Sequence, residues 1–335
     1  MSLVADTTAA SDTAYALRVA IAAGVCLALA EWWRLPHANL AVWTTHMVMV
    51  SVPFTVFQKG VERIVGRGLG VLAGILIQAL LPNQIVLQLI IEAALIALAF
   101  YIYFAGRLAY TALNAGLYLA AILQFARSDP DQAASYGVEV LTAVTLGVVV
   151  ADAVNWLAGT ERKLTITAGT TLLLPVRLDW LNRAVMLCVT AMLTQLAARW
   201  LDLPATQAVI SVMMLTLAAD IQGVLLKGEL RLLGAALGSA WALFSLLILT
   251  QIDHFPLLLA LVFFGMFLAA YLAKTGGRYA YAGVQMGLVL PLIVIVPSEE
   301  FGTLTGAYQR MQGVVSALAV TIMVAALWPR FELKS

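Results

Sequence analysis

Long apolar runs separated by short polar turns dominate this sequence. A helix needs about 20 apolar residues to cross the roughly 30 Å hydrocarbon core of a bilayer. The turn signals and charges divide the chain into about twelve such runs, with ten as the lower bound: 15–34, 38–57, 64–81, 84–104, 107–126, 138–158, 180–200, 205–224, 230–250, 255–273, 279–297 and 308–328. The pattern predicts an all-α polytopic membrane protein with about 12 transmembrane helices.

The composition supports the same class. Of the 335 residues, 62% are hydrophobic and 11% are charged, whereas a soluble domain carries roughly 25% charged residues. The net charge of +1 and the lack of a large basic patch argue against nucleic acid as a partner. Cys26 and Cys188 both fall inside apolar runs, which indicates small buried side chains rather than a disulfide framework or a metal site.

The charges also predict an orientation. With the N-terminus in the cytoplasm, fifteen of the 19 Lys and Arg residues fall at cytoplasmic helix ends and loops. The other side gathers acidic residues: Asp129, Asp131, Asp202, Asp253, Glu299 and Glu300. By the positive-inside rule, both termini are expected in the cytoplasm.

The chain contains an internal repeat. Lys59, Gly60, Arg63, Gly66 and Gly70 recur 168 residues later as Lys227, Gly228, Arg231, Gly234 and Gly238, and Pro36 recurs as Pro204. In both copies we expect a basic helix entrance followed by a face of small residues that packs closely on a neighbour. With six spans, each half begins and ends on the same side of the membrane, so the two halves have the same orientation. The sequence therefore predicts two parallel six-helix repeats, 1–160 and 161–335.

The repeated basic residues are candidates for binding anions at a cytoplasmic vestibule. Lys59, Arg63 and Arg67 are spaced by four residues, which places them on one helix face, and Lys227 with Arg231 repeats the first two. The alternative is that these side chains extend to the lipid headgroups and only fix the orientation of the helix.

A second repeated set suits the recognition of a carboxylate. Its members are Arg107, Tyr110 and Asn114, matched 171 residues later by Arg278, Tyr281 and Gln285. The spacing stacks a guanidinium, a phenol and an amide along one helix face, groups that grip a carboxylate, stack on a ring and donate hydrogen bonds. Tyrosine and arginine at a helix end also serve as interface anchors, so this second interpretation stays open.

Four ionisable residues fall inside predicted spans and are candidates for proton coupling: His46, Glu92, Asp152 and Asp220. A charged side chain at the centre of a bilayer is costly, so each marks a functional hypothesis by default. None has an ionisable match in the other half, and this asymmetry is what a single proton path on a pseudo-symmetric frame would give. A structural hydrogen bond to a neighbouring helix is the alternative for each.

Signals of enzyme chemistry are absent. The sequence has no nucleophile elbow, no zinc-binding His or Cys motif and no phosphate-binding loop. We therefore expect neither catalysis nor a cofactor.

The two copies of Lys-Gly-x-x-Arg-x-x-Gly-x-x-x-Gly, each preceded by a Pro-headed span, resemble the fusaric acid resistance family of bacterial inner-membrane exporters. This family includes aromatic acid efflux pumps and is similar in its membrane part to plant malate channels. The chain resembles the short members, because it lacks the large cytoplasmic domain that many members carry. The resemblance implies proton-driven export of aromatic or other small organic acids, with a periplasmic adaptor of the membrane fusion type.

Together these observations predict a multi-pass protein of the bacterial inner membrane, in contact with lipid, that exports organic anions along a path between its halves. Homo-oligomerisation is compatible with this interpretation. The alternatives are a passive organic-anion channel, which needs no titratable residue at depth, and a membrane scaffold that transports nothing.

Overall fold

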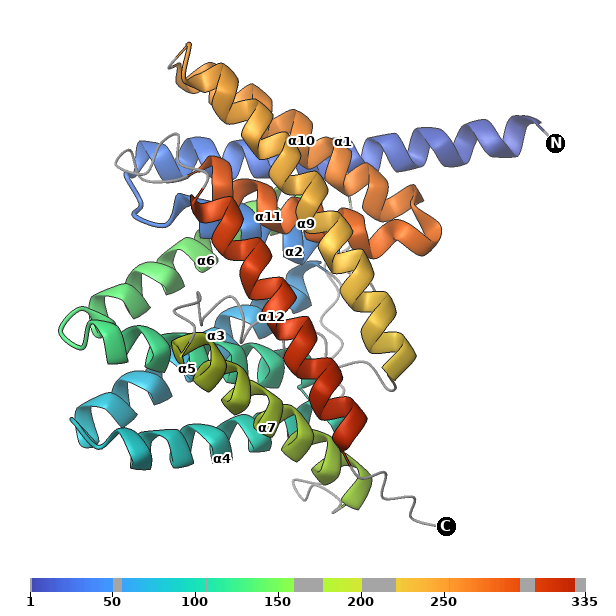
Figure 1. The fold of residues 1–335 in the computed structure, drawn as a ribbon. Coiled ribbons are helices and arrows are strands. Elements are labelled where there is room, and N and C mark those ends of the chain that lie inside the picture. Colours follow the sequence, from blue (N-terminus) through green and yellow to red (C-terminus); the bar gives the residue numbers. More distant parts are fainter. Residues whose placement is uncertain are drawn as a thin grey trace. The chain divides into compact units, whose positions relative to one another are not determined.

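The structure is a computed structural model that describes residues 2–50, 56–106, 108–159, 177–200, 221–252, 254–295 and 305–328. Throughout these ranges the regular structure is helical (Figure 1). The helices are α1 (Ser2–Trp32), α2 (Ala38–Val50), α3 (Val56–Leu80), α4 (Ile85–Phe104), α5 (Ala109–Ser128), α6 (Ala133–Leu157), α7 (Leu178–Trp200), α9 (Ile221–Leu249), α10 (Phe255–Thr275), the 3-10 turn η1 (Gly277–Tyr279), α11 (Ala280–Val294) and α12 (Thr305–Leu327).

Membrane-spanning helices make up most of the described chain. Eight of the described helices are long and apolar enough to cross a bilayer. The predicted all-α, multi-pass membrane class is thereby confirmed, whereas the count of twelve spans stays a prediction. The predicted span 205–224 and two of the candidate site residues, Arg107 and Asp220, lie largely or wholly outside the described residues.

The helices that carry the repeated basic stretch begin before the predicted spans. The sequence pattern predicts that the third span begins at residue 64, but α3 begins at Val56, and α9 likewise begins at Ile221 and not at residue 230. The helix extends through Lys59 and Arg63 because both side chains are buried against protein. Hydropathy alone ends a span at such charges, since it treats each charged residue as exposed to lipid.

The described residues fall into two compact units that do not follow the sequence halves. Unit 1 lies within 1–61, 139–164 and 229–311, and unit 2 lies within 62–138, 165–228 and 312–335. Each unit therefore takes helices from both halves of the chain. The boundary near residue 160 remains a prediction about the sequence repeat.

Unit 1 is built around α1 and α10. In this unit α1 packs along α10 and α2, and α11 packs along both α10 and α2. The hydroxyl of Thr45 on α2 donates to the carbonyl oxygens of Ala41 and Gly147, at 3.0 and 3.1 Å, and so ties α2 to α6. The indole Nε1 of Trp241 donates to the Leu261 carbonyl at 3.0 Å, which joins α9 to α10.

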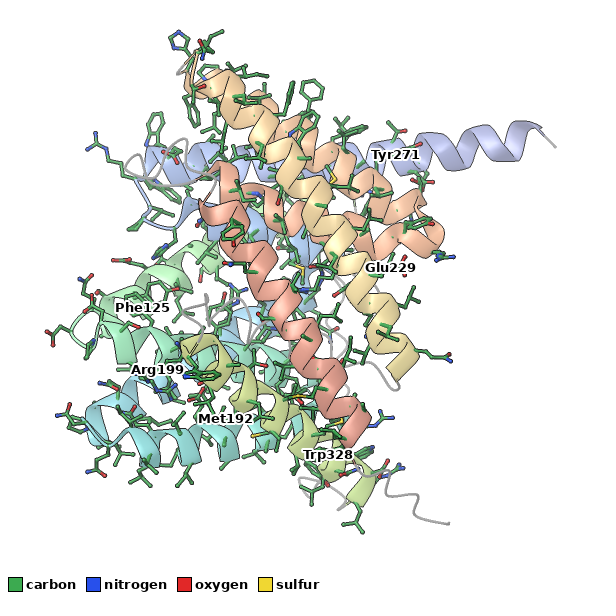
Figure 2. All side chains as sticks on the ribbon, viewed as in Figure 1. Phe125, Met192, Arg199, Glu229, Tyr271 and Trp328 are labelled. Atoms are coloured by element: carbon green, nitrogen blue, oxygen red, sulfur yellow. The ribbon has the colours of Figure 1, made fainter. Side chains whose placement is uncertain are left out.

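Unit 2 is built around α4, which packs along α5 and α7. Phe125, labelled in Figure 2, lies near the end of α5. Its ring stacks on that of Tyr136 of α6, with 4.1 Å between ring centroids. Trp328, just after α12, donates its indole N–H to the Asn182 side chain of α7 at 3.0 Å (Figure 2). These contacts join α5 to α6 and the end of α12 to α7.

Candidate functional site

The basic side chains of α3 are covered by protein. Lys59 and Arg63 are each 2% exposed, and Arg67 is fully buried. Lys59, which belongs to unit 1, donates to the Met47 carbonyl at the end of α2. A headgroup anchor keeps its charge at the membrane surface, so the burial favours the anion-binding interpretation of this stretch. Buried charges cost much free energy unless they are paired, which makes them rare outside functional sites.

In unit 2, two arginines of α3 meet tyrosines of α5. A guanidinium nitrogen of Arg63 donates to the hydroxyl of Tyr110. One turn further, the guanidinium carbon of Arg67 lies 4.1 Å from the ring centroid of Tyr118, within the range of a cation–π contact. The tyrosines thus hold both planar cations in fixed orientations, as recognition of a planar anion requires.

Gly66 allows α3 to come this close to α5. A side chain at this position would collide with the carbonyl oxygen of Thr111 and would reach to within 2.9 Å of the Cβ atom of Asn114. Asn114 is 2% exposed, and its amide nitrogen donates to the Tyr110 carbonyl at 2.7 Å. The glycine therefore sets the separation at which arginine and tyrosine side chains of the two helices interdigitate.

Unit 1 contains a related contact between α9 and α11. Gly234 lies against the Ala282 carbonyl and the Cβ atom of Gln285, the positions that match the neighbours of Gly66 in the repeat. Arg231 lies one turn before Gly234 and is 8% exposed, whereas Lys227 is half-buried. Gln285 is 2% exposed, and its amide nitrogen has no hydrogen-bond partner in the part of the chain that the structure describes.

The two contacts differ in charge. The position that matches Arg67 is Ala235, and the position that matches Tyr118 is Val289. Unit 1 therefore lacks the second guanidinium and its aromatic partner.

Of the two arginines predicted beside a tyrosine and an amide, Arg107 lies outside the described residues, and Arg278 is placed differently from the prediction. Arg278 lies in η1, before α11 begins, and is exposed, with its guanidinium carbon 5.5 Å from the ring centroid of Tyr279. Tyr281 is half-buried in the first turn of α11. Among the described residues, Tyr110 pairs with Arg63 of another helix. The three-residue stack that the spacing predicts in each half stays a prediction.

His46 occupies a crowded position between α2 and α11 of unit 1. Its ring is fully buried, and its Nε2 atom lies 3.2 Å from the Val284 carbonyl oxygen. A side chain at Gly287 would collide with the imidazole. The Nδ1 atom has no partner among the described residues, so His46 retains one ring nitrogen for a further hydrogen bond.

The candidate acids have different environments. Glu92 of α4 is fully buried in unit 2 and pairs there with Arg127 of α5 and Gln195 of α7. Asp152 is half-buried in α6. Sequence reasoning missed Arg127 and Gln195 as partners, because no local spacing connects residues on three different helices. The described residues contain no group of three or more His, Cys, Asp or Glu side chains that could hold a metal ion.

Unit 2 also has an apolar groove of about 390 Å³ between α3, α4 and α5. Leucine, alanine, isoleucine and glycine dominate its walls, and Thr111 is the single hydroxyl-bearing residue in its lining. Such walls suit hydrocarbon rather than a carboxylate. The buried arginines of α3 are therefore the better candidates for contact with an anion.

Comparison with known proteins extends this description. The model of the Fusaric acid resistance protein family matches residues 12–170. The match agrees with the resemblance that the repeated motif indicates, and it covers the first copy of that motif. No curated protein and no solved structure matches the chain with significant similarity.

Proposed function

Residues 12–170 match the model of the Fusaric acid resistance protein family, and from this match we propose that the chain exports aromatic or other small organic acids. The family and the many apolar helices support a multi-pass membrane protein with a role in transport or efflux. Export of organic anions is the finer statement, and the bacterial inner membrane is its proposed location.

The proposed architecture has twelve spans in two parallel six-helix repeats, with both termini in the cytoplasm. The recurrence of the glycine-centred contact at Gly66 and Gly234 supports the repeat. The excess of basic residues at one set of helix ends supports the orientation.

The buried cations are the observation that carries the proposal. Lys59, Arg63 and Arg67 on α3 and Arg231 on α9 are at most 8% exposed. A protein that only had to cross the membrane would gain nothing from these charges, since each costs desolvation free energy. A protein that draws carboxylates into the bilayer needs them.

The proposed roles follow the two sets of residues. Substrate contact is assigned to Lys59, Arg63, Tyr110, Asn114, Lys227, Arg231, Tyr281 and Gln285, with Arg67 and Tyr118 added from the structure and Arg107 and Arg278 from the sequence. Proton coupling is assigned to His46, Glu92, Asp152 or Asp220. A periplasmic adaptor protein is the proposed partner, and neither enzymatic activity nor a cofactor is proposed.

Transport in liposomes tests the proposal. Purified protein is reconstituted, and movement of radiolabelled benzoate is followed with and without a pH gradient across the bilayer. We expect benzoate movement only when the gradient is present. Movement that ignores the gradient would favour a passive channel, and no movement of any aromatic acid in a panel would contradict the proposal.

Replacing Arg63 by Lys separates anion recognition from anchoring. Lysine keeps the charge but loses the planar fork that bonds Tyr110 and a carboxylate together. We expect benzoate transport to fall by about tenfold, because a hydrogen bond to a charged group contributes about 1.5–3 kcal/mol. Arg231→Lys is the parallel change in unit 1.

The matched control is Arg177→Lys, at an exposed arginine whose partner is the equally exposed Asp179. We expect this variant to transport at the wild-type rate. Normal transport by Arg63→Lys and Arg231→Lys would contradict anion recognition by these residues and would favour their role as topological anchors.

A further inference from the structure

A buried polar cluster in unit 2 joins three helices. Arg127 of α5 forms an ion pair with Glu92 of α4, and the Glu92 side chain is fully buried while that of Arg127 is 7% exposed. The Gln195 amide of α7 donates to Glu92 Oε1 at 2.6 Å and accepts a hydrogen bond from Arg127 at 3.1 Å. All three side chains therefore bond to each other, and they hold α4, α5 and α7 together.

The cluster lies near one end of these helices. Glu92 is about 10 Å along α4 from its first residue, at 1.5 Å per residue, and Arg127 is in the last turn of α5. Gln88, one turn before Glu92, donates to the Gln78 side chain at 3.0 Å and to the Leu81 carbonyl at 2.8 Å. The buried Gln88 thus lies between the α3–α4 turn and Glu92 along α4, on the side that the charge pattern places outside the cytoplasm.

The matching position in unit 1 is apolar. In the repeat, Glu92 corresponds to Phe263 and Gln195 corresponds to Leu27, and both of these side chains belong to the α1 and α10 pair. A buried ion pair stabilises a fold no better than well-packed apolar side chains do. Unit 1 shows that the packing of these helices does not need charge, so the charges in unit 2 have another use.

We propose that Glu92, Arg127 and Gln195 form a proton-operated latch at the outer end of unit 2. When Glu92 is ionised, its ion pair with Arg127 and the two hydrogen bonds of the Gln195 side chain hold α7 against α4 and α5. A proton that arrives through the polar side chains near Gln88 binds a Glu92 carboxylate oxygen and removes its charge. Arg127 then leaves for the helix end, where Asp129 is half-buried and Asp131 is exposed, and α7 separates from α4.

The groups that surround Glu92 are few. Arg127 of α5 and Gln195 of α7 bond to its carboxylate. Cys188 of α7 bonds to the backbone carbonyl of the next residue, Ala93. Among the described residues, Arg127 is thus the one charged partner that protonation would release. This inference rests on the proposed proton coupling and assigns Glu92 to it, with Arg127 and Gln195 as positioning residues.

Cys188 provides a reporter within the latch. Its thiol donates to the Ala93 carbonyl of α4 at 3.1 Å, and the residue is 8% exposed. In a Cys26→Ala background it is the single cysteine of the chain. The reagent N-ethylmaleimide reacts with it only when α7 and α4 separate, so the rate of labelling measures opening.

The experiment follows labelling of Cys188 in the reconstituted full chain between pH 8 and pH 5. The reactive thiolate is lost as the pH falls, by about tenfold per pH unit, so each labelling rate is divided by the rate for the unfolded protein at the same pH. We expect this relative rate to rise on acidification by about tenfold per pH unit while Glu92 titrates. In Glu92→Gln, which cannot ionise, labelling is expected to be fast and to show no rise at low pH.

Controls separate this inference from the transport proposal and from a purely structural role. Cys26, buried in unit 1, is tested in a Cys188→Ala background and should stay unlabelled at every pH.

A double variant, Glu92→Leu with Arg127→Leu, replaces the ion pair by apolar side chains. A purely structural role predicts normal pH-driven benzoate transport by this variant, whereas a latch predicts loss of the response to outer pH. A relative labelling rate of Cys188 that does not change with pH would overturn the latch even where benzoate transport is normal. Acid-dependent labelling without any transport would overturn the transport proposal alone.

Discussion

Gly66→Ala is expected to lower the stability of the folded protein by about 1–3 kcal/mol, the usual cost of overpacking a tight interface. The added methyl group would collide with the backbone carbonyl of Thr111, which cannot move without shifting α5 as a whole. Separation of α3 from α5 would also pull Arg63 from Tyr110. The measurement is the thermal unfolding midpoint of the detergent-solubilised protein together with the yield of its monodisperse peak.

Gly24→Ala is the matched control for this prediction. It makes the same change in another membrane helix, but a methyl group at Gly24 would lie 3.7 Å from Leu259 and 3.9 Å from Phe263, which is ordinary van der Waals contact. We expect this variant to unfold at the wild-type temperature or slightly above, since alanine favours the helix. A Gly66→Ala protein as stable as Gly24→Ala would show that α3 does not depend on close approach to α5.

The helical class and the importance of the repeated stretch could both be predicted from the sequence. Apolar runs near 20 residues leave few alternatives to membrane helices, and glycines every fourth residue indicate a packing face. The described contacts of Gly66 and Gly70 with α5 lie on that face. Periodicity could find the face because it depends only on residues within one helix.

The partners of that face could not be predicted. The pairing of Arg63 with Tyr110 joins residues 47 positions apart, and the pairing of Gln195 with Glu92 joins residues 103 positions apart. No local pattern encodes such distances. The compact units likewise combine helices from both halves of the chain, whereas a repeat in sequence suggests one unit for each half.

Charge inside the helices was also misjudged by hydropathy. Span boundaries were expected next to Arg63 and Arg231 because a charge facing lipid ends a span. In the structure these side chains face other helices, and the exposed positions of α3 are apolar, among them Val65, Leu69 and Leu72. Where a charge points away from lipid, its cost is set by its protein partners and not by its depth.

Arg67→Met is expected to reduce benzoate transport by about 10- to 100-fold while the protein stays folded, because a contact with a charged group contributes about 1.5–3 kcal/mol. Methionine fills a similar volume and removes the cost of burying a charge, so the stability should hold or rise. The unit 1 counterpart, Ala235, shows that the backbone contact forms without a cation at this position.

Tyr118→Phe is the control, since phenylalanine keeps the ring over which the Arg67 guanidinium lies. This variant should transport nearly as well as the wild type. Transport rates and unfolding midpoints are measured on the same preparations. Wild-type transport by Arg67→Met would place the anion site elsewhere, whereas a loss confined to this variant would make Arg67 of unit 2 the cation that gives the two related helix contacts different roles.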